Sequence, residues 1–524
     1  MTSAKLVAPD ISNALLDQMK YRADPLADAT IANILGDWLP PPAVSASTSA
    51  SVDKTQHAKT NHADADQAAA KLAEFASPWQ TQWQRLAIVS SIFAQWSDNQ
   101  SLISWHGQGA PAVADIPPDM VTALQAYVKA ANGLPEWACH DKILRAEKIF
   151  TDYGVLSVTL LFCSSLPECY VIPDLAAVLN ATGQLVDHAE YRVRATGAMI
   201  FPVMMKGGLT DPDGGGIAQV FKVRLIHATI RNLILRGNPE AALAVYTANK
   251  TLLNAGVIAP MAALGQSQDM HQILFAHGWR LDESGLPCNQ EELAYTLLTF
   301  SYVFLRSMRK LGLGLPGEDE EAYLHAWNVM AYFLGIEKAL MPATMAEAEA
   351  MFTLMQARGR QDQAAGQHGH SNQLDPRPAL GRALMDAMKS AIPFRIFKPF
   401  PVMLTRYLCG SATAKELGLN GWISPLSRLL FTGLMLLIRL IDSTVRLVSP
   451  GFSISRLLTR IFGYRFICKL LMDQTRPLKI PLGVRQSAMT TMAGWGHDTK
   501  ASKWINSLED MFTNHGDWQQ PTKK

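Results

Sequence analysis

IAQVFKVRLIHATIRNLILRG, residues 217–237, predicts a long buried helix with a single histidine near its centre. Apolar side chains recur along it at spacings of three and four residues, which is the period of one helical face. These side chains are Val220, Val223, Ile230 and Ile234, and His227 falls in the same series. We therefore expect His227 to point into the protein.

Arg224 and Arg231 lie three residues before and four residues after His227, so both are expected on its side of the helix. Guanidinium groups on an inward face need anionic partners. A haem would satisfy the whole set, because its iron can take an imidazole nitrogen and its propionates accept bidentate hydrogen bonds from arginine. The alternative is that His227 is an ordinary hydrogen-bonded core residue, as histidines of intermediate burial commonly are.

The overall composition favours an intracellular protein with no nucleic-acid partner. Its 524 residues include 47 Lys or Arg and 45 Asp or Glu, which gives a net charge of +2. The six cysteines show no CxxC pairing, which argues against a zinc ribbon or a disulfide framework. The N-terminus lacks a basic start followed by an apolar run, so we expect no secretory signal and a cytoplasmic location.

The chain divides into four segments by composition. Residues 1–75 are expected to be largely disordered, with one short amphipathic helix near their start. Residues 76–394 carry the helical pattern of one large domain, interrupted by a polar loop at 360–378. A basic segment follows at 395–480, and 481–524 form a polar tail. Alternating strand patterns are largely missing, so the predicted fold class is all-α.

Two further helical regions lie before the histidine helix. Residues 140–185 read as two helices that are broken at Leu166-Pro167 and restart after Pro173. The next helix places Arg192, Thr196 and Met199 on the face of His188, and it is the expected partner of the His227 helix.

The connection between these last two helices, GGLTDPDGGG, is flexible and acidic in character. Its glycines neither follow a strand nor end in Lys-Ser/Thr, so we expect a tight inter-helix turn rather than a phosphate-binding loop. Later in the chain, Asn289 is a plausible N-cap with Glu292 as its capping-box partner.

The C-terminal basic segment has 13 Lys or Arg between Arg395 and Lys479, against only three acidic residues. Its uncharged stretch, 429–438, is ten residues long, about half of a membrane span. Arginines that interrupt apolar runs suit helices lying on an anionic membrane surface. They equally suit a helical cap over the core with arginines at its rim, and the sequence leaves both interpretations open.

Five motifs follow one another between Ser165 and Pro342: SLPECYVIPD, Arg192-x-x-x-Thr196, KVRLIHATIR, PCNQEELAYTLLTFSYVFLRSMRKLG and EAYLHAWNVM. In this order they resemble the latex-clearing protein and MpaB family, the haem-dependent rubber oxygenases and the oxygenase of mycophenolate biosynthesis. The resemblance covers about a third of the chain. It implies a large helical domain around a buried haem b, and an oxidoreductase that uses dioxygen on a double bond of a hydrophobic substrate.

The resemblance also implies roles for individual residues. His227 matches the proximal ligand of the haem iron, and Arg224 and Arg231 are its companions in cofactor binding. Arg192 and Thr196 match catalytic polar residues over the opposite face of the haem.

One position departs from the rubber oxygenases, which carry a lysine just before the threonine where this chain has Ala195. A membrane-borne isoprenoid or other lipid alkene is therefore a more plausible substrate than rubber. Glu168 and Asp174 are candidates for the distal carboxylate that the family is proposed to use.

Two other functions fit the same residues. One is a non-haem metal oxygenase in which His227 shares a metal ion with His188, His325 or Glu321. The other is a non-catalytic helical protein that holds a lipid in its apolar interior.

Overall fold

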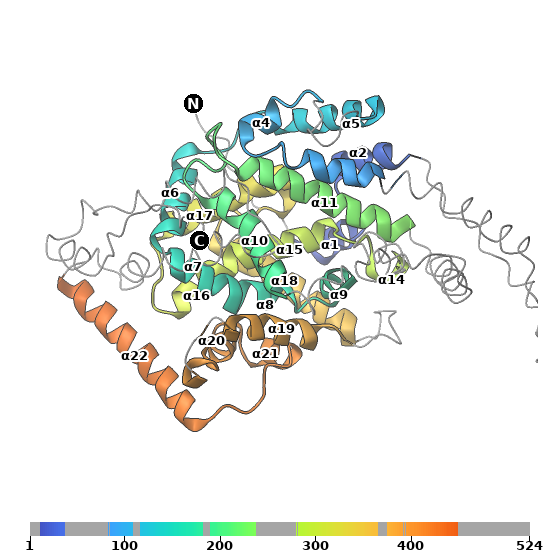
Figure 1. Ribbon diagram of the computed structural model, residues 1–524. Helices are drawn as coiled ribbons and strands as arrows, with labels where there is room; N and C mark the ends of the chain where they lie inside the picture. Colours follow the sequence, from blue (N-terminus) through green and yellow to red (C-terminus); the bar gives the residue numbers. More distant parts are fainter. Residues whose placement is uncertain are drawn as a thin grey trace, which may run out of the picture.

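The computed structural model describes residues 11–36, 82, 84–107, 116–181, 189–236, 279, 281–364, 375–390, 392 and 395–448. The described residues form helices, turns and irregular connections, with no β-strand among them (Figure 1). The predicted all-α class is therefore confirmed.

Helix α17 (Gly317–Leu334) lies in the centre of the molecule and packs against α6 (His140–Asp152), α11 (Gly216–Arg236) and α15 (Gln290–Phe300) (Figure 1). It is buried around most of its circumference, as expected of a helix with apolar residues on all sides. Acidic residues in its first turn complement the helix dipole, and Gly335 ends it in the left-handed conformation, with φ of 84°.

Helix α10 (Ala189–Met204) packs against α11, which confirms the predicted pairing of the Arg192–Thr196 helix with the His227 helix. Pro202 lies inside α10 rather than ending it. The two helices are therefore joined by a short turn that begins at Met205.

Polar side chains hold this turn in place. Asn99, at the start of α4 (Asn99–Ile103), donates to the carbonyls of Gly208 and Asp211, both at 2.9 Å, and accepts from the Ala218 amide at 3.2 Å. A Cβ on Gly208 would lie 2.0 Å from the Pro202 carbonyl oxygen, so the turn requires glycine there. The connection that looked flexible in the sequence is thus tightly anchored.

The N-terminal region contributes two helices to this body, α1 (Asn13–Met19) and α2 (Pro25–Leu35). The predicted short helix is α1. The sequence reading missed α2, which begins with Asp24 as N-cap and Pro25 in the first turn and buries Ile31 and Ile34 against the core. Helix α2 lies against α11 and α5 (Pro118–Val128), so part of the segment expected to be largely disordered is structural.

The region expected to form two helices forms more. After α6 come α7 (Gly154–Leu160), a π-helical turn η3 (Leu161–Ser165), α8 (Leu166–Cys169) and α9 (Pro173–Ala181). The break predicted at Leu166-Pro167 is wrong, because the chain stays helical from η3 into α8, and Pro167 directly follows the π-helical turn, whose shifted hydrogen bonds accommodate a residue without an amide hydrogen. The predicted restart at Pro173 is confirmed.

The remaining α-helices complete the body and its C-terminal extension. These are α14 (Leu281–Ser284), α16 (Tyr302–Lys310), α18 (Met345–Ala364), α19 (Arg377–Ser390), α20 (Phe400–Cys409), α21 (Ser411–Glu416) and α22 (Pro425–Val448). Of the described helices, none is by itself long and apolar enough to cross a membrane. The bent pair 140–152 and 156–169 passes that test only when taken together.

Glu147 of α6 provides a second anchor for the turn between α10 and α11. Its carboxylate accepts from the Gly207 amide at 3.0 Å, and the residue is only 2% exposed. Burial raises the pKa of Glu147 to about 7 from an ordinary value of 4.5.

The folded protein therefore holds the Glu147 proton more tightly than the unfolded chain does. This contribution to the free energy of unfolding is full below pH 4.5 and is lost as the pH rises to about 7. Replacing Glu147 with Gln keeps an acceptor for the amide and should remove a pH dependence on the order of 3 kcal/mol. Chemical unfolding between pH 4.5 and 8 measures it, and an unchanged slope in Glu147→Gln would contradict the assignment.

Candidate functional site

The site is built on α11. Its predicted inner face is confirmed, since Val220, Ile230 and Ile234 are buried and Val223 is partly buried. His227 lies near the middle of the helix and is half-buried. Its position is fixed by the two arginines on either side, because both are bound to neighbouring elements.

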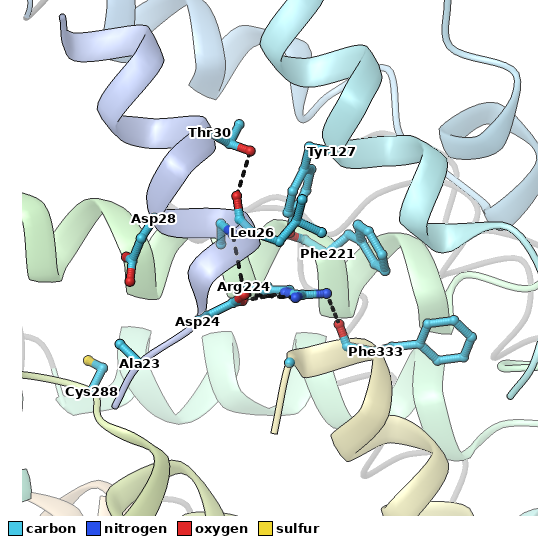
Figure 2. Close-up of polar contacts among 12 residues, drawn as sticks. Ala23, Asp24, Leu26, Asp28, Thr30, Tyr127, Phe221, Arg224, Cys288 and Phe333 are labelled. Carbon is cyan, nitrogen blue, oxygen red and sulfur yellow. Dashed lines mark hydrogen bonds and ion pairs between the residues drawn. The ribbon is translucent and has the colours of Figure 1, made fainter. Parts of the chain in front are cut away.

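Arg224 binds the N-cap residue of α2. Its Nε and Nη2 atoms donate to the carboxylate of Asp24, at 2.7 Å for the Nη2–Oδ1 pair, and Nη1 donates to the Phe333 carbonyl at 3.1 Å (Figure 2). The guanidinium also lies within 6 Å of the rings of Tyr127 and Phe221. Because Asp24 is 3% exposed and Arg224 10% exposed, this is a buried ion pair.

Arg231 makes a second pair one turn farther along α2. Its Nε donates to both oxygens of Asp28, at 2.9 and 3.0 Å, and Nη1 donates to the carbonyls of Cys288 and Pro287, at 2.7 and 3.1 Å. Arg231 is 2% exposed. The two arginines therefore clamp α2, α11 and the segment before α15 together.

These contacts test how well the residues fit a haem. The partly buried imidazole of His227 has the donor chemistry of an axial iron ligand. In the structure the guanidiniums of Arg224 and Arg231 donate to aspartates and carbonyls, and the two arginines anchor α2. Their role in cofactor binding stays a prediction.

The predicted polar residues of the opposite side lie on α10. Thr196 is half-buried, and Arg192 lies one turn before it in the same helix. One turn after Thr196 is Ile200, which shares its helical face and is 2% exposed. The side chain of Arg192 lies outside the described part of the structure.

Ile200 lines a small apolar pocket with about 10 Å³ of free space, room for about one water molecule. All the residues of its wall are buried, and they come from α6, α7, η3, α10, α15, α16 and α17. They are Phe150, Ser157, Val158, Leu161, Ser165, Ile200, Phe201, Phe300, Phe304, Tyr323 and Trp327. We call this pocket the apolar chamber; its aromatic and aliphatic wall begins one turn from Thr196.

A second, more polar cavity with about 40 Å³ of free space lies at the start of α15. It is lined by Asp174 and by Glu292, whose backbone amide binds the Asn289 side chain at 2.9 Å, which confirms Asn289 as the N-cap. Burial, with the nearby charge of Asp174, raises the pKa of Glu292 well above its ordinary range. His227 is not among the described residues that line this cavity or the apolar chamber.

Glu168, a candidate for the distal carboxylate, is engaged in the core. It is 1% exposed, and its carboxylate accepts from Arg306 at 2.6 Å and from Gln356 at 2.9 Å. It braces α8 against α16 and α18. Asp174 borders the polar cavity instead, and the role of either residue as a base stays a prediction.

The residues of the non-haem alternative are not brought together. Among the described residues, no group of three or more His, Cys, Asp and Glu side chains is arranged to hold a metal ion. His325 accepts from the Cys139 amide at 2.8 Å, and burial lowers its pKa to about 4. Glu321 forms an exposed pair with Lys142 at 3.7 Å, and His188 lies outside the described residues.

Sequence reasoning missed the two aspartates of α2 and the chamber. Asp24 and Asp28 lie about 200 residues before the arginines that they bind, so nothing local in the sequence indicated the pairing. The chamber had no local signal either, because its wall is assembled from seven elements that are distant in sequence.

The structure is that of an all-α protein. Its helix α11 carries the half-buried His227 and packs against α10, whose residue Ile200 lines the apolar chamber. Residues 170–440, slightly more than half of the chain, match the catalytic-domain family described as ER-bound oxygenase mpaB/B'/Rubber oxygenase. The chain belongs to this family, which confirms the resemblance drawn from the five motifs.

Two individual proteins are similar to this chain. The rubber oxygenase of Streptomyces sp. (strain K30) is 22% identical over 266 residues, covering 50% of this chain and 52% of the relative. This chain thus spans about half the length of that curated relative. A structure of latex clearing protein LCP in the closed state is 15% identical, with a TM-score of 0.47 and coverage of 91% of this chain and 90% of that one.

The clamp on α11 makes a direct prediction. Replacing Asp24 with Ala leaves the buried Arg224 guanidinium without its carboxylate and should lower the free energy of unfolding by about 3–5 kcal/mol. Breaking the exposed Lys389–Asp386 pair with Lys389→Ala should cost less than about 1 kcal/mol and serves as the control. Chemical unfolding measures both, and equal stabilities of the two variants would contradict the structural role of the clamp.

Proposed function

We propose that this chain is a haem b-dependent oxygenase that uses dioxygen to oxidise or cleave a double bond of an apolar isoprenoid or lipid substrate. Membership of the oxygenase family supports the reaction class. The observation that carries the proposal is the buried apolar chamber whose wall includes Ile200, one turn along α10 from Thr196. A hydrocarbon chain in that chamber would lie next to the predicted catalytic helix.

In this proposal His227 would hold the haem iron as its axial ligand. The bound haem would supply the activation of dioxygen. By the resemblance, Thr196 and Arg192 would donate hydrogen bonds on the haem face opposite His227. The clamp of Arg224 and Arg231 would contribute by fixing the helix that carries the imidazole, since a ligand held by a rigid element keeps its geometry.

The chamber would bind and orient the substrate. Each methylene group moved from water into such walls contributes about 0.8 kcal/mol, so a short hydrocarbon segment gains enough to be held in place. Its free space of about 10 Å³ is far below the roughly 300–1,000 Å³ of a typical ligand site, so the substrate would enter as the surrounding side chains move apart. Ala195 at the lysine position supports a small lipid alkene rather than rubber as the substrate.

The absorption spectrum of the purified protein tests the cofactor. Reconstitution with haem should produce a Soret band, and His227→Ala should abolish it while the protein stays folded by circular dichroism. His140→Ala, at an exposed position on α6, is the matched control and should keep the band. A protein that takes up no haem would refute the proposal.

Metal analysis of the same preparation separates the alternatives. Stoichiometric iron without porphyrin would favour the non-haem oxygenase. Neither iron nor porphyrin, with lipid that co-purifies, would favour the lipid-binding protein.

The chamber can be tested separately. Val158→Phe places a ring in a wall position that is 1% exposed, and it should lower kcat/KM for lipid alkenes at least about tenfold while the Soret band is unchanged. Ile31→Phe adds a ring at an equally buried position on α2 and shows how much overpacking alone lowers kcat/KM. Turnover by Val158→Phe equal to that of Ile31→Phe would remove the chamber from the substrate path.

A further inference from the structure

Helix α22 exposes its apolar face. Over its 24 residues, large apolar side chains remain open to solvent, with Leu429 70%, Leu436 60%, Leu440 66% and Leu447 86% exposed. Leu426, Leu430, Leu434, Leu437 and Ile441 are 37–56% exposed as well. An exposed apolar stripe of this length is unusual on a soluble protein and marks a surface with a partner.

The side of α22 that faces the body of the protein is mixed. It carries Arg439 and Asp442 together with the partly buried, apolar Met435. Arg439 donates to the Tyr407 hydroxyl at 2.7 Å and to the Lys310 carbonyl, and Asp442 is only 4% exposed. Helix α22 thus meets the body with a narrow side and leaves its wide leucine face open to solvent, whereas an ordinary surface helix covers the core with its apolar side. Figure 1 shows α22 running along the outside of the molecule, away from the central helices.

The N-terminal end of α22 adds an aromatic and cationic rim. Trp422 is 80% exposed, and its loop is held by Arg406, which donates to the carbonyls of Leu419 and Gly421, both at 2.6 Å. The neighbouring turn η5 (Arg395–Phe397) exposes apolar side chains too and is joined to α22 through contacts of Phe400 with Phe397 and Phe431. Exposed cations also stand at this end, namely Arg395, Lys398 and Arg428.

The charge of the segment is one-sided. Residues 395–448 contain seven Lys or Arg and two acidic residues, a difference of 7 − 2 = +5. Both acidic residues are unavailable to a partner, because Glu416 is paired with Arg360 at 3.0 Å and Asp442 is buried. The face presented to a partner is therefore leucine-rich and cationic.

We propose that α22, with Trp422 and the η5 turn, is a docking surface for an anionic lipid bilayer. A straight, almost purely aliphatic stripe about 36 Å long fits a fluid acyl layer, whereas protein interfaces centre on Trp, Tyr and Arg anchors in shaped pockets. Tryptophan is favoured at the membrane–water boundary, and the exposed cations complement acidic headgroups. No described helix spans a membrane alone, so α22 lies on the surface of the bilayer.

The docking surface is independent of the proposed chemistry, and its test uses the full chain without added haem. Co-flotation is measured with vesicles of phosphatidylcholine alone and with vesicles that contain phosphatidylglycerol. The protein should float with the acidic vesicles and much less with the neutral ones, and salt should weaken the binding. Replacing Leu429, Leu436 and Leu440 together with Glu should weaken binding at least about 100-fold.

A matched variant controls for added charge. Leu144→Glu, Leu235→Glu and Leu281→Glu together change apolar residues that are 37%, 41% and 44% exposed elsewhere on the molecule, and they should leave flotation unchanged. Circular dichroism and sedimentation velocity establish that each variant is folded and give its mass. The proposal would be overturned if the native chain does not float, or if the triple variant floats as well as the native chain. It would also be overturned if the native chain is a dimer and the triple variant is a monomer, because the stripe would then join two copies.

Discussion

The structure depends on the burial of two guanidinium groups on α11. Arg224 and Arg231 are 10% and 2% exposed, and a buried charge is tolerated only when acceptors surround it. Asp24 and Asp28 supply them, which forces α2 to dock along α11 although about 200 residues separate the two helices in sequence. The docked pair covers one side of α11, so the position of His227 follows from these contacts.

A second constraint is the pairing of α10 with α11. Asn99 and Glu147, from two different helices, hold the turn that joins them. Because that turn is anchored, Thr196 and the chamber wall at Ile200 keep a fixed relation to the histidine helix. An apolar chamber at a rigid helix pair and an apolar stripe on α22 form a consistent set, since a lipid substrate would be drawn from a bilayer and held away from water.

Much of this fold could be predicted from the sequence because the signals are local. The 3.6-residue period gave the buried face of α11, and Asn289 and Pro173 marked helix starts through their own backbone chemistry. What the sequence could not show required distant partners. The aspartates that bind Arg224 and Arg231 lie about 200 residues away, and the leucines of α22 could be assigned no direction until Tyr407 and Lys310 showed which side meets the body.

The central claim is that His227 binds haem iron on the helix held by the two ion pairs. The most direct measurement is a crystal structure of the haem-loaded protein with anomalous diffraction at the iron absorption edge. The account predicts one strong iron peak at coordination distance from an imidazole nitrogen of His227, with Arg224 and Arg231 still bound to Asp24 and Asp28. An iron peak at any other side chain, or arginines turned away from the aspartates onto the propionates, would contradict it.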